Sequence, residues 1–211
     1  LYPGAWAPAT FSSIQGGLIV RNWMVVGPFG GPGAERFNFD GFADKSVARA
    51  FFSSTHYPPD QRVDLSAHYT GPGIQGYWPD PKAEQWQPQQ TVAVADPILK
   101  LGFCAQTWYA DTWIYAPAHM QLNATLFSGE MSDVSLSLNK ARVNASAHQP
   151  VPAAPHIFQS PLTLSVHKGW NELTTRGFCV GYPPLRTGLI LNGPADNLWK
   201  LRLSPRPEGL Q

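Results

Sequence analysis

The side chains best suited to bind a ligand are aromatic rings in segments rich in proline and glycine. A ring in such a loop is hard to bury fully. It can stack on the C–H face of a sugar while polar neighbours bond the hydroxyl groups. The alternative for every ring is packing onto the protein's own core. The candidate rings are Tyr57, Tyr69, Tyr77, Trp78 and Trp86, and the polar neighbours are Arg36, Asn38, Asp40, Asp80 and Gln85.

Recognisable catalytic signatures are missing from this sequence. None of the six histidines belongs to an H-E-x-x-H or H-x-H pattern, which argues against a zinc site. No serine lies in a G-x-S-x-G motif. A glycosidase needs two carboxylates that converge on one bond, and no spacing singles out such a pair. An enzyme therefore stays an alternative without assigned residues.

The composition limits the classes of protein to which this chain can belong. Its 211 residues are enough for one large β domain with its own core. Charged residues make up 14% and the net charge is +1, which is far from the basic surface of a nucleic-acid binder. No stretch approaches the roughly 18 apolar residues of a membrane span. The chain starts at Leu1 without a visible signal peptide, so we expect a mature or excised fragment.

The elements that must position these side chains are antiparallel strands. In residues 120–127, and again in 134–138, every second residue is apolar. Period two places the apolar set on the core face and the polar set, with Asn123 and Thr125, toward solvent. Turn-forming Ser-Gly and Ser-Asp sequences separate the runs, which predicts hairpins. Further strands are expected over residues 18–26, 91–95, 98–103, 161–167, 170–176, 188–191 and 198–203, with 47–53 as another candidate.

Proline and glycine punctuate the chain. The 21 prolines and 19 glycines favour strands joined by many turns over long helices. Residues 30–90 are rich in both and are predicted to form a long loop insertion, which adds either a loop-built site or a few extra strands. A loop of this length inside a compact domain is unusual unless it has a function. We divide the chain into an N-terminal loop (1–17), a single β-sandwich domain (18–203) and a C-terminal tail or linker (204–211).

The two cysteines leave two interpretations open. Cys104 and Cys179 each follow a Gly-Phe pair beside an expected strand. A disulfide between them would close a long loop and stabilise the fold by about 3–5 kcal/mol. The alternative is a pair of buried free thiols, which are common core residues.

Four segments carry motifs that resemble those of a known sandwich family. Residues 21–29 (RNWMVVGPF) are similar to an opening W-x-V-x-G-P-F strand, and residues 109–115 (YADTWIY) to a Y-A-x-T-x-I-Y strand. Residues 135–140 (SLSLNK) resemble a v-x-l-N-G-k hairpin, with Lys140 in place of the usual glycine. Residues 164–173 (LSVHKGWNEL) are close to l-x-l-k-x-G-W-N-x-L. On these motifs the chain resembles the galactose-binding-domain-like β-sandwich of bacterial glycan-degrading and cell-surface proteins.

The resemblance implies an all-β, antiparallel β-sandwich of the jelly-roll kind, with the 30–90 insertion as a departure. It also implies a non-catalytic carbohydrate-binding module, covalently linked to other domains of a larger secreted or cell-surface bacterial protein. Its partner would be a polysaccharide or an oligosaccharide, and its compartment periplasmic or extracellular. In this sandwich class a loop-bound Ca²⁺ ion is a further expectation, with Asp40 and Asp44 as oxygen donors. No other cofactor is expected.

Two alternatives of different classes stay open. One is a structural or interaction β-sandwich domain of a multidomain enzyme without its own sugar site. It predicts that Tyr77, Trp78 and Trp86 are buried or form one apolar patch. The other is a jelly-roll lyase or hydrolase, which predicts that carboxylates, histidines or tyrosines converge in one cleft.

Overall fold

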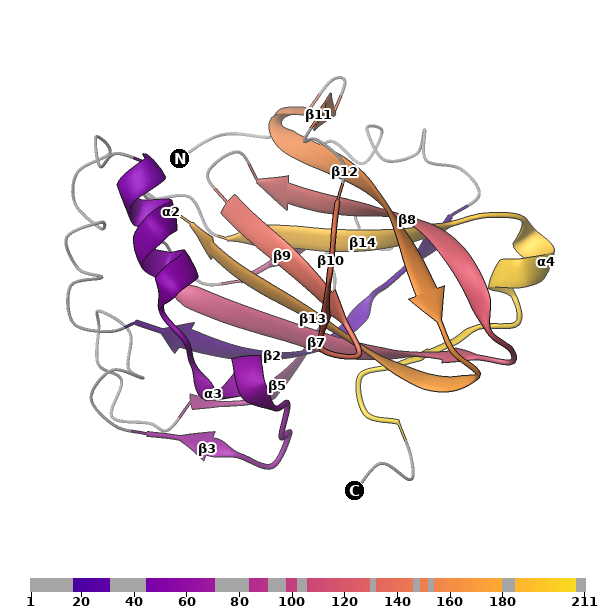
Figure 1. The fold of residues 1–211 in the computed structure, drawn as a ribbon, viewed down its shortest axis with the longest axis horizontal. Helices are drawn as coiled ribbons and strands as arrows, with labels where there is room; N and C mark the ends of the chain where they lie inside the picture. The colour runs from indigo at the N-terminus through magenta and orange to yellow at the C-terminus, as the bar shows by residue number, and fades with distance from the viewer. Residues whose placement is uncertain are drawn as a thin grey trace.

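The computed structural model is mostly β, with two large antiparallel sheets, one two-stranded sheet and short helices (Figure 1). It describes residues 17–30, 45–70, 84–90, 98–101, 106–129, 132–145, 149–151, 154–179 and 185–207. The predicted antiparallel β-sandwich is therefore confirmed at this level. Among the described residues no helix is long and apolar enough to span a membrane.

Each of the two sheets brings together strands that are far apart in the sequence. Sheet A has the order β1-β14-β8-β12-β11, and β6 also pairs with β14. Sheet B has the order β10-β9-β13-β7-β2-β5, and β15 also pairs with β7. The strands of sheet A are β1 (Leu18–Ile19), β6 (Ile98–Lys100), β8 (Met120–Gly129), β11 (Gln149–Val151), β12 (Ala154–Val166) and β14 (Arg186–Asn192). The strands of sheet B are β2 (Asn22–Phe29), β5 (Gln87–Gln90), β7 (Thr107–Ala116), β9 (Ser132–Leu138), β10 (Ala141–Val143), β13 (Gly169–Cys179) and β15 (Arg202–Ser204).

The main core lies between the two sheets and follows the predicted alternation. Leu122 and Leu126 of β8 are buried there together with Leu136 of β9 and Leu173 of β13. Asn123, between the two β8 leucines, is exposed on the opposite side of the strand. Full burial of one leucine side chain contributes about 1.5–3 kcal/mol, so this core fixes which face of each strand is left for a site.

The turn between β9 and β10 explains how lysine can replace the glycine of the family motif. Asn139 and Lys140 have φ values of 50° and 68°, the left-handed pair of a type I′ hairpin turn. The Asn139 amide oxygen accepts a hydrogen bond from the backbone N–H of Glu172 at 2.9 Å. Its amide nitrogen donates to the Asn171 side-chain oxygen at 3.0 Å. These bonds join the hairpin to β13 and offset the strain of a lysine with positive φ.

The described part of the 30–90 insertion contains regular structure, which includes extra strands of the kind that the sequence left open. It includes α2 (Lys45–Ser54), α3 (Pro58–Gln61), β3 (His68–Tyr69) and β4 (Glu84–Gln85), of which β3 and β4 pair with each other. In Figure 1, α2 lies at one end of the molecule and α4 (Ala195–Leu198) at the other. The candidate strand over 47–53 is helix α2, and the predicted strand over 198–203 is correct only for residues 202–203 of β15.

Tertiary packing explains why residues 47–53 are helical. Phe52 is fully buried and its ring stacks on Phe178 of β13, with centroids 4.7 Å apart. Val47, five residues earlier, is half exposed. One buried side and one exposed side are typical of a helix lying on a sheet. The predicted strand over 91–95 lies outside the described residues.

Candidate functional site

Three of the predicted ligand-binding rings form a small core on the outer face of sheet B. Tyr57, Tyr69 and Trp86 keep only 5%, 7% and 3% of their surface exposed. The ring centroid of Phe29 lies 5.2 Å from that of Tyr57 and 5.6 Å from that of Tyr69. Trp86 Nε1 donates a hydrogen bond to the Tyr69 hydroxyl oxygen at 3.2 Å. These rings pack the insertion onto the sheet, and none of the three presents a free face to a sugar.

The other predicted site residues are not brought together in the described structure. Gln85 is exposed and directly precedes the buried Trp86. The side chain of Cys179, one half of the candidate disulfide, lies outside the described residues. The same holds for Arg36, Asn38, Asp40, Asp44, Tyr77, Trp78, Asp80 and Cys104.

An open groove of about 820 Å³ lies beside the β9–β10 hairpin, and we call it the amide groove. It is lined from β8, β12 and β14 of sheet A and from the β9–β10 hairpin of sheet B. Its polar lining consists of amides, hydroxyls and one guanidinium, without a carboxylate. The residues that line it are Asn123, Ala124, Thr125, Leu138, Asn139, Ala141, Arg142, Val143, Asn144, Pro161, Leu162, Thr163, Ser165 and Asn192.

Strand register aligns the polar side chains of the amide groove. Asn123 of β8 is the cross-strand partner of Thr163 on one side and of Asn192 on the other. Cross-strand partners point to the same side of a sheet, so the three form a row. The Asn192 amide nitrogen donates to the Thr125 hydroxyl oxygen at 2.8 Å. The row therefore offers both donors and acceptors at fixed spacing, which is what a ligand with many hydroxyls requires.

A second, smaller depression of about 140 Å³ lies on the outer face of sheet B, and we call it the cationic pocket. Its floor consists of two cross-strand rows: Ser135 beside Arg176 beside Tyr109, and Ser137 beside Thr174. Residues 59–63, from α3 and the segment after it, form one wall, and the β9–β10 hairpin forms the other. Its charged lining residues are Asp60, Arg62, Lys140, Arg142, Glu172 and Arg176.

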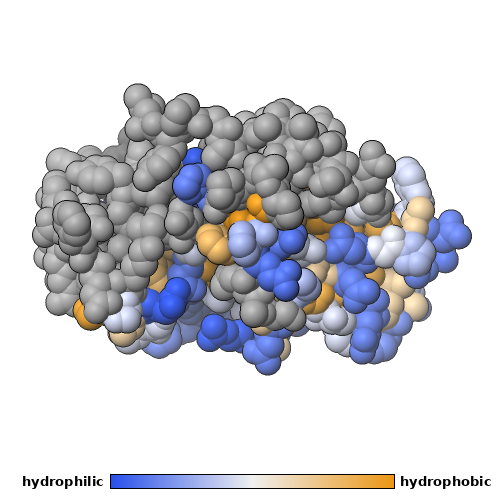
Figure 2. All heavy atoms as spheres, turned by 90° about the horizontal axis from the view of Figure 1, so that it is seen from above, coloured by the Kyte–Doolittle hydropathy of each residue, from blue (hydrophilic) through white to orange (hydrophobic). Residues whose placement is uncertain are grey.

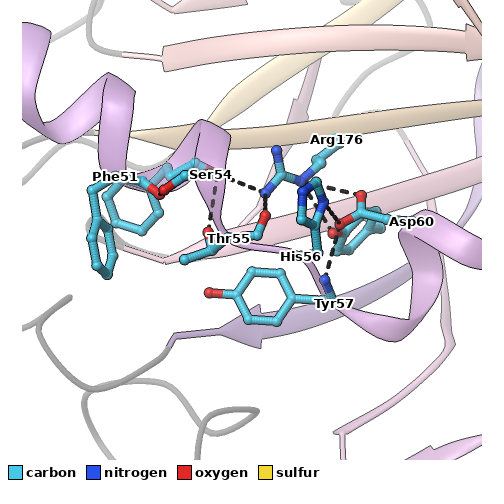
Figure 3. A network of polar contacts seen from close by, with 9 residues as sticks. Phe51, Ser54, Thr55, His56, Tyr57, Asp60 and Arg176 are labelled. Carbon is cyan, nitrogen blue, oxygen red and sulfur yellow. Dashed lines mark hydrogen bonds and ion pairs between the residues drawn. The ribbon is translucent and has the colours of Figure 1, made fainter.

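Arg176 connects the floor of this pocket to the insertion (Figure 3). Its Nη2 donates to the backbone carbonyl oxygens of Phe52 and Thr55 at 2.7 and 2.8 Å. Its Nε donates to the Tyr109 hydroxyl oxygen at 3.1 Å and lies 3.3 Å from Asp60 Oδ1. The two carbonyls belong to the C-terminal end of α2, where a cation is favoured by the helix dipole. Arg176 and Asp60 thus neutralise each other while fixing α2 and α3 to sheet B.

Two other carboxylates on the outer face of sheet B have perturbed environments. Burial raises the pKa of Glu172, and the nearby charge of Lys140 opposes this. Asp111 is fully buried, and loss of hydration raises the pKa of its carboxyl well above the ordinary value. The Thr174 hydroxyl donates to Asp111 Oδ1 at 2.5 Å, whereas Oδ2 has no hydrogen-bond partner among the described residues. Both carboxyls are therefore easier to protonate than surface carboxyls.

The buried environment of Tyr109 makes its phenol a poor general base. Its phenol is almost completely buried, and burial raises its pKa far above the ordinary value of a tyrosine. The group is therefore a hydrogen-bonding phenol at physiological pH and accepts a bond from Arg176. Within the described ranges no three His, Cys, Asp or Glu side chains converge as metal ligands.

One aromatic ring that the sequence did not single out is open to solvent. Trp199, directly after α4, has 85% of its surface exposed. It follows β14, the strand that contributes Asn192 to the amide groove. On the face shown in Figure 2, hydrophilic residues predominate in the described part and apolar atoms show between them.

Comparisons with known proteins add no assignment to this geometry. A scan of protein-family models finds no match to the chain, and a search of curated proteins finds no significant relative.

The residues of both depressions were only partly accessible to sequence reasoning. The period-two pattern placed Asn123 and Thr125 on the solvent face of their strand, and the structure confirms this. It gave no sign that Thr163 and Asn192 flank Asn123, because this depends on the pairing register of distant strands.

Proposed function

We propose that this protein is a non-catalytic carbohydrate-binding module that holds a polysaccharide or oligosaccharide in the amide groove. By the motifs it shares with the galactose-binding-domain-like jelly roll, it would be part of a larger bacterial protein that is secreted or displayed at the cell surface. The groove lies open along its length, which suits an extended chain of sugars better than an enclosed small molecule.

The observation that carries the proposal is the chemistry of the groove lining. Asn123, Asn192 and Thr163 form a row of neutral donors and acceptors, and Asn139 and Asn144 add further amides at the hairpin. A side-chain amide can hydrogen-bond two neighbouring sugar hydroxyls, because both amides and hydroxyls donate and accept hydrogen bonds. Apolar lining such as Pro161, Val143 and Leu162 can cover the C–H faces of the sugar rings.

The aromatic part of the proposal changes from the rings first expected. Tyr57, Tyr69 and Trp86 are core residues, so stacking would fall to Trp199 or to the predicted residues Tyr77 and Trp78. Each neutral hydrogen bond contributes only about 0.5–1.5 kcal/mol net. A groove that depends mainly on such bonds binds with modest affinity.

The test is affinity electrophoresis and calorimetry of the purified protein against a panel of plant, algal and bacterial polysaccharides. The double variant Asn123→Ala/Asn192→Ala should bind a retained polysaccharide roughly tenfold or more weakly, since two hydrogen-bonding groups are lost. Gln121→Ala is the matched control, because Gln121 is exposed on the same strand but does not line the groove.

Two results would contradict the proposal. One is that no polysaccharide retains the wild-type protein at high protein concentration. The other is that the double variant binds as tightly as the wild type while remaining folded.

A structural or interaction domain is the second candidate, and the burial of Trp86 favours it. In that case the insertion would serve only to cover sheet B, and a partner domain would cover other surfaces. Failure of every polysaccharide to retain the folded wild-type protein would favour this candidate.

A further inference from the structure

The cationic pocket carries more positive than negative charge. Its lining has four cations, Arg62, Lys140, Arg142 and Arg176, and two carboxylates, Asp60 and Glu172. Arg176 is 3.3 Å from Asp60 Oδ1, so these two opposite charges are paired. Three cations then face the single carboxylate of Glu172. Because the whole chain has a net charge of only +1, this is a local concentration of positive charge.

Of the charged groups just outside the pocket, Asp64 interacts with Arg62 and offsets part of its charge, which leaves Lys140 and Arg142 as the cations opposite Glu172. Asp133, also on β9, is paired with Arg49 of α2. His56 lies with its Nδ1 3.7 Å from Asp60 Oδ2. Asp111 is buried, and it accepts a hydrogen bond from the hydroxyl of its cross-strand partner Thr174.

Hydroxyl groups and size make the pocket suitable for an oxyanion. Ser135 and Ser137 lie on the floor, and Ser137 is the cross-strand partner of Arg142 on one side and of Thr174 on the other. A guanidinium next to hydroxyl donors is a common way to bind carboxylate or sulfate oxygens. A volume of about 140 Å³ corresponds to roughly four or five water molecules. That space admits an anionic substituent with part of one sugar ring, but not a chain.

The pocket and the amide groove meet at the β9–β10 hairpin. Arg142 lines both depressions. At the turn, Asn139 lines the groove and its neighbour Lys140 lines the pocket. β10 is the edge strand of sheet B, so a ligand in the groove reaches the pocket by crossing a single hairpin.

We propose that the cationic pocket is an anion subsite of the amide groove, and that the glycan bound there is acidic, bearing carboxylate or sulfate groups. This inference rests on the proposed carbohydrate-binding function and specifies its ligand class. Arg62, Lys140 and Arg142 attract the acidic substituent, while Glu172 lowers the affinity for it. The neighbouring neutral residues of the groove hold the sugar hydroxyls.

The experiment compares three polymers on the intact protein: a neutral galactan, a uronate polymer such as polygalacturonate, and a sulfated galactan. Binding of wild type is measured by calorimetry beside Arg62→Gln/Lys140→Gln, with Lys200→Gln as an exposed cation outside the pocket. The double variant should bind the preferred acidic polymer roughly fivefold or more weakly, because two cation contacts are lost. Glu172→Gln should bind it more tightly than wild type, and Lys200→Gln should be unchanged. Preference for the uronate or the sulfated polymer identifies the acidic group.

A second experiment tests anion binding in the pocket without any polymer. Inorganic sulfate and free galacturonate are titrated into ¹⁵N-labelled protein, and the amide signals of Ser137 and Thr174 should shift saturably in wild type but not in the double variant. Equal shifts in wild type and the double variant, or tighter binding of the neutral galactan than of both acidic polymers, would overturn the anion subsite. If no polymer binds but the small anions still shift these signals, the proposed function fails while the pocket remains an anion site.

Discussion

The outer face of sheet B and one end of the outer face of sheet A are built from the same kind of alternating strand but differ in whether they are covered. On sheet B, the apolar residues Met24, Val26 and Phe29 face outward and are buried in a second core with rings from the insertion. At one end of the outer face of sheet A, Phe127 and Ile190 belong to a separate buried apolar cluster. At the other end, Asn123 and Thr163 face outward and remain exposed in the amide groove.

The difference shows which property of an outer face decides whether it is covered. An apolar outer row needs a layer over it, because exposed apolar surface is costly and prone to association. Helices α2 and α3 and the β3–β4 pair supply that layer. A row of amides and hydroxyls is well solvated without a cover and keeps its hydrogen-bonding groups free for a ligand.

The largest expected effect is the loss of the layer on sheet B. In Arg176→Ala, the C-terminal carbonyls of α2 lose the guanidinium that binds them, and Asp60 loses its ion pair with arginine. We therefore expect the free energy of unfolding to fall by about 3 kcal/mol. Urea denaturation measures this value. Arg49→Ala is the control, because the Arg49–Asp133 pair is largely exposed and should contribute about 0.5 kcal/mol or less. Equal destabilisation by both variants would contradict the role of Arg176.

A somewhat smaller effect is expected at the junction of the two regions. Asn171 is fully buried; its amide nitrogen donates to the carbonyl oxygens of His167 and Gly169 at 2.9 and 3.0 Å, and its oxygen accepts from Asn139 at 3.0 Å. Asn171→Ala leaves several of these groups unpaired and should cost about 2 kcal/mol.

Thermal unfolding of Asn171→Ala beside Asn197→Ala, an exposed asparagine of α4, measures this difference. Because the Asn139 turn separates groove from pocket, Asn171→Ala should also weaken glycan binding. Unchanged stability would show that the network does not hold the hairpin.

The smallest effect concerns the buried carboxyl of sheet B and depends on pH. The pKa of Asp111 is higher in the folded protein than in the unfolded chain, so the folded state holds its proton more tightly. Its contribution to stability is therefore greatest in acid and declines as the pH rises from the ordinary aspartate range through the raised pKa. Asp111→Asn should remove this decline and be more stable than wild type at neutral pH, by on the order of 1 kcal/mol.

Urea unfolding between pH 4 and pH 8 tests this sign. Asp64→Asn is the opposite control: hydrogen bonds from Ser66 lower the pKa of Asp64, so the stability that Asp64 adds is present at neutral pH and lost in acid. A wild-type advantage over Asp111→Asn that grows with pH would contradict the account of Asp111.

The sandwich could be predicted from the sequence because each strand has a local signal in its alternation of apolar and polar residues. Alternation in residues 120–127 and 134–138 needs no knowledge of partners, and both runs are strands with the predicted buried face. Helix α2 was missed because its buried side is set by contact of Phe52 with Phe178, more than a hundred residues away. Short windows carry no signal for such a contact.

The candidate site was harder to predict for the same physical reason. Proline and glycine around Tyr57 and Trp86 indicate a turn-rich segment, but whether a ring there is exposed depends on what lies under it. In this chain it is Phe29 and Tyr109, which bury those rings. The pairing of Asn123 with Asn192 and of Arg176 with Asp60 likewise arises only from the tertiary fold.

The most direct test of the central claim is to locate the bound glycan by NMR. Amide signals of the ¹⁵N-labelled protein are followed during titration with an oligosaccharide from a polymer that retains the protein. The account predicts saturable shifts at Asn123, Thr163 and Asn192, with little change at Tyr69, Gln85 and Trp86. Shifts confined to the second group would place the glycan on the insertion and contradict the amide groove as its site.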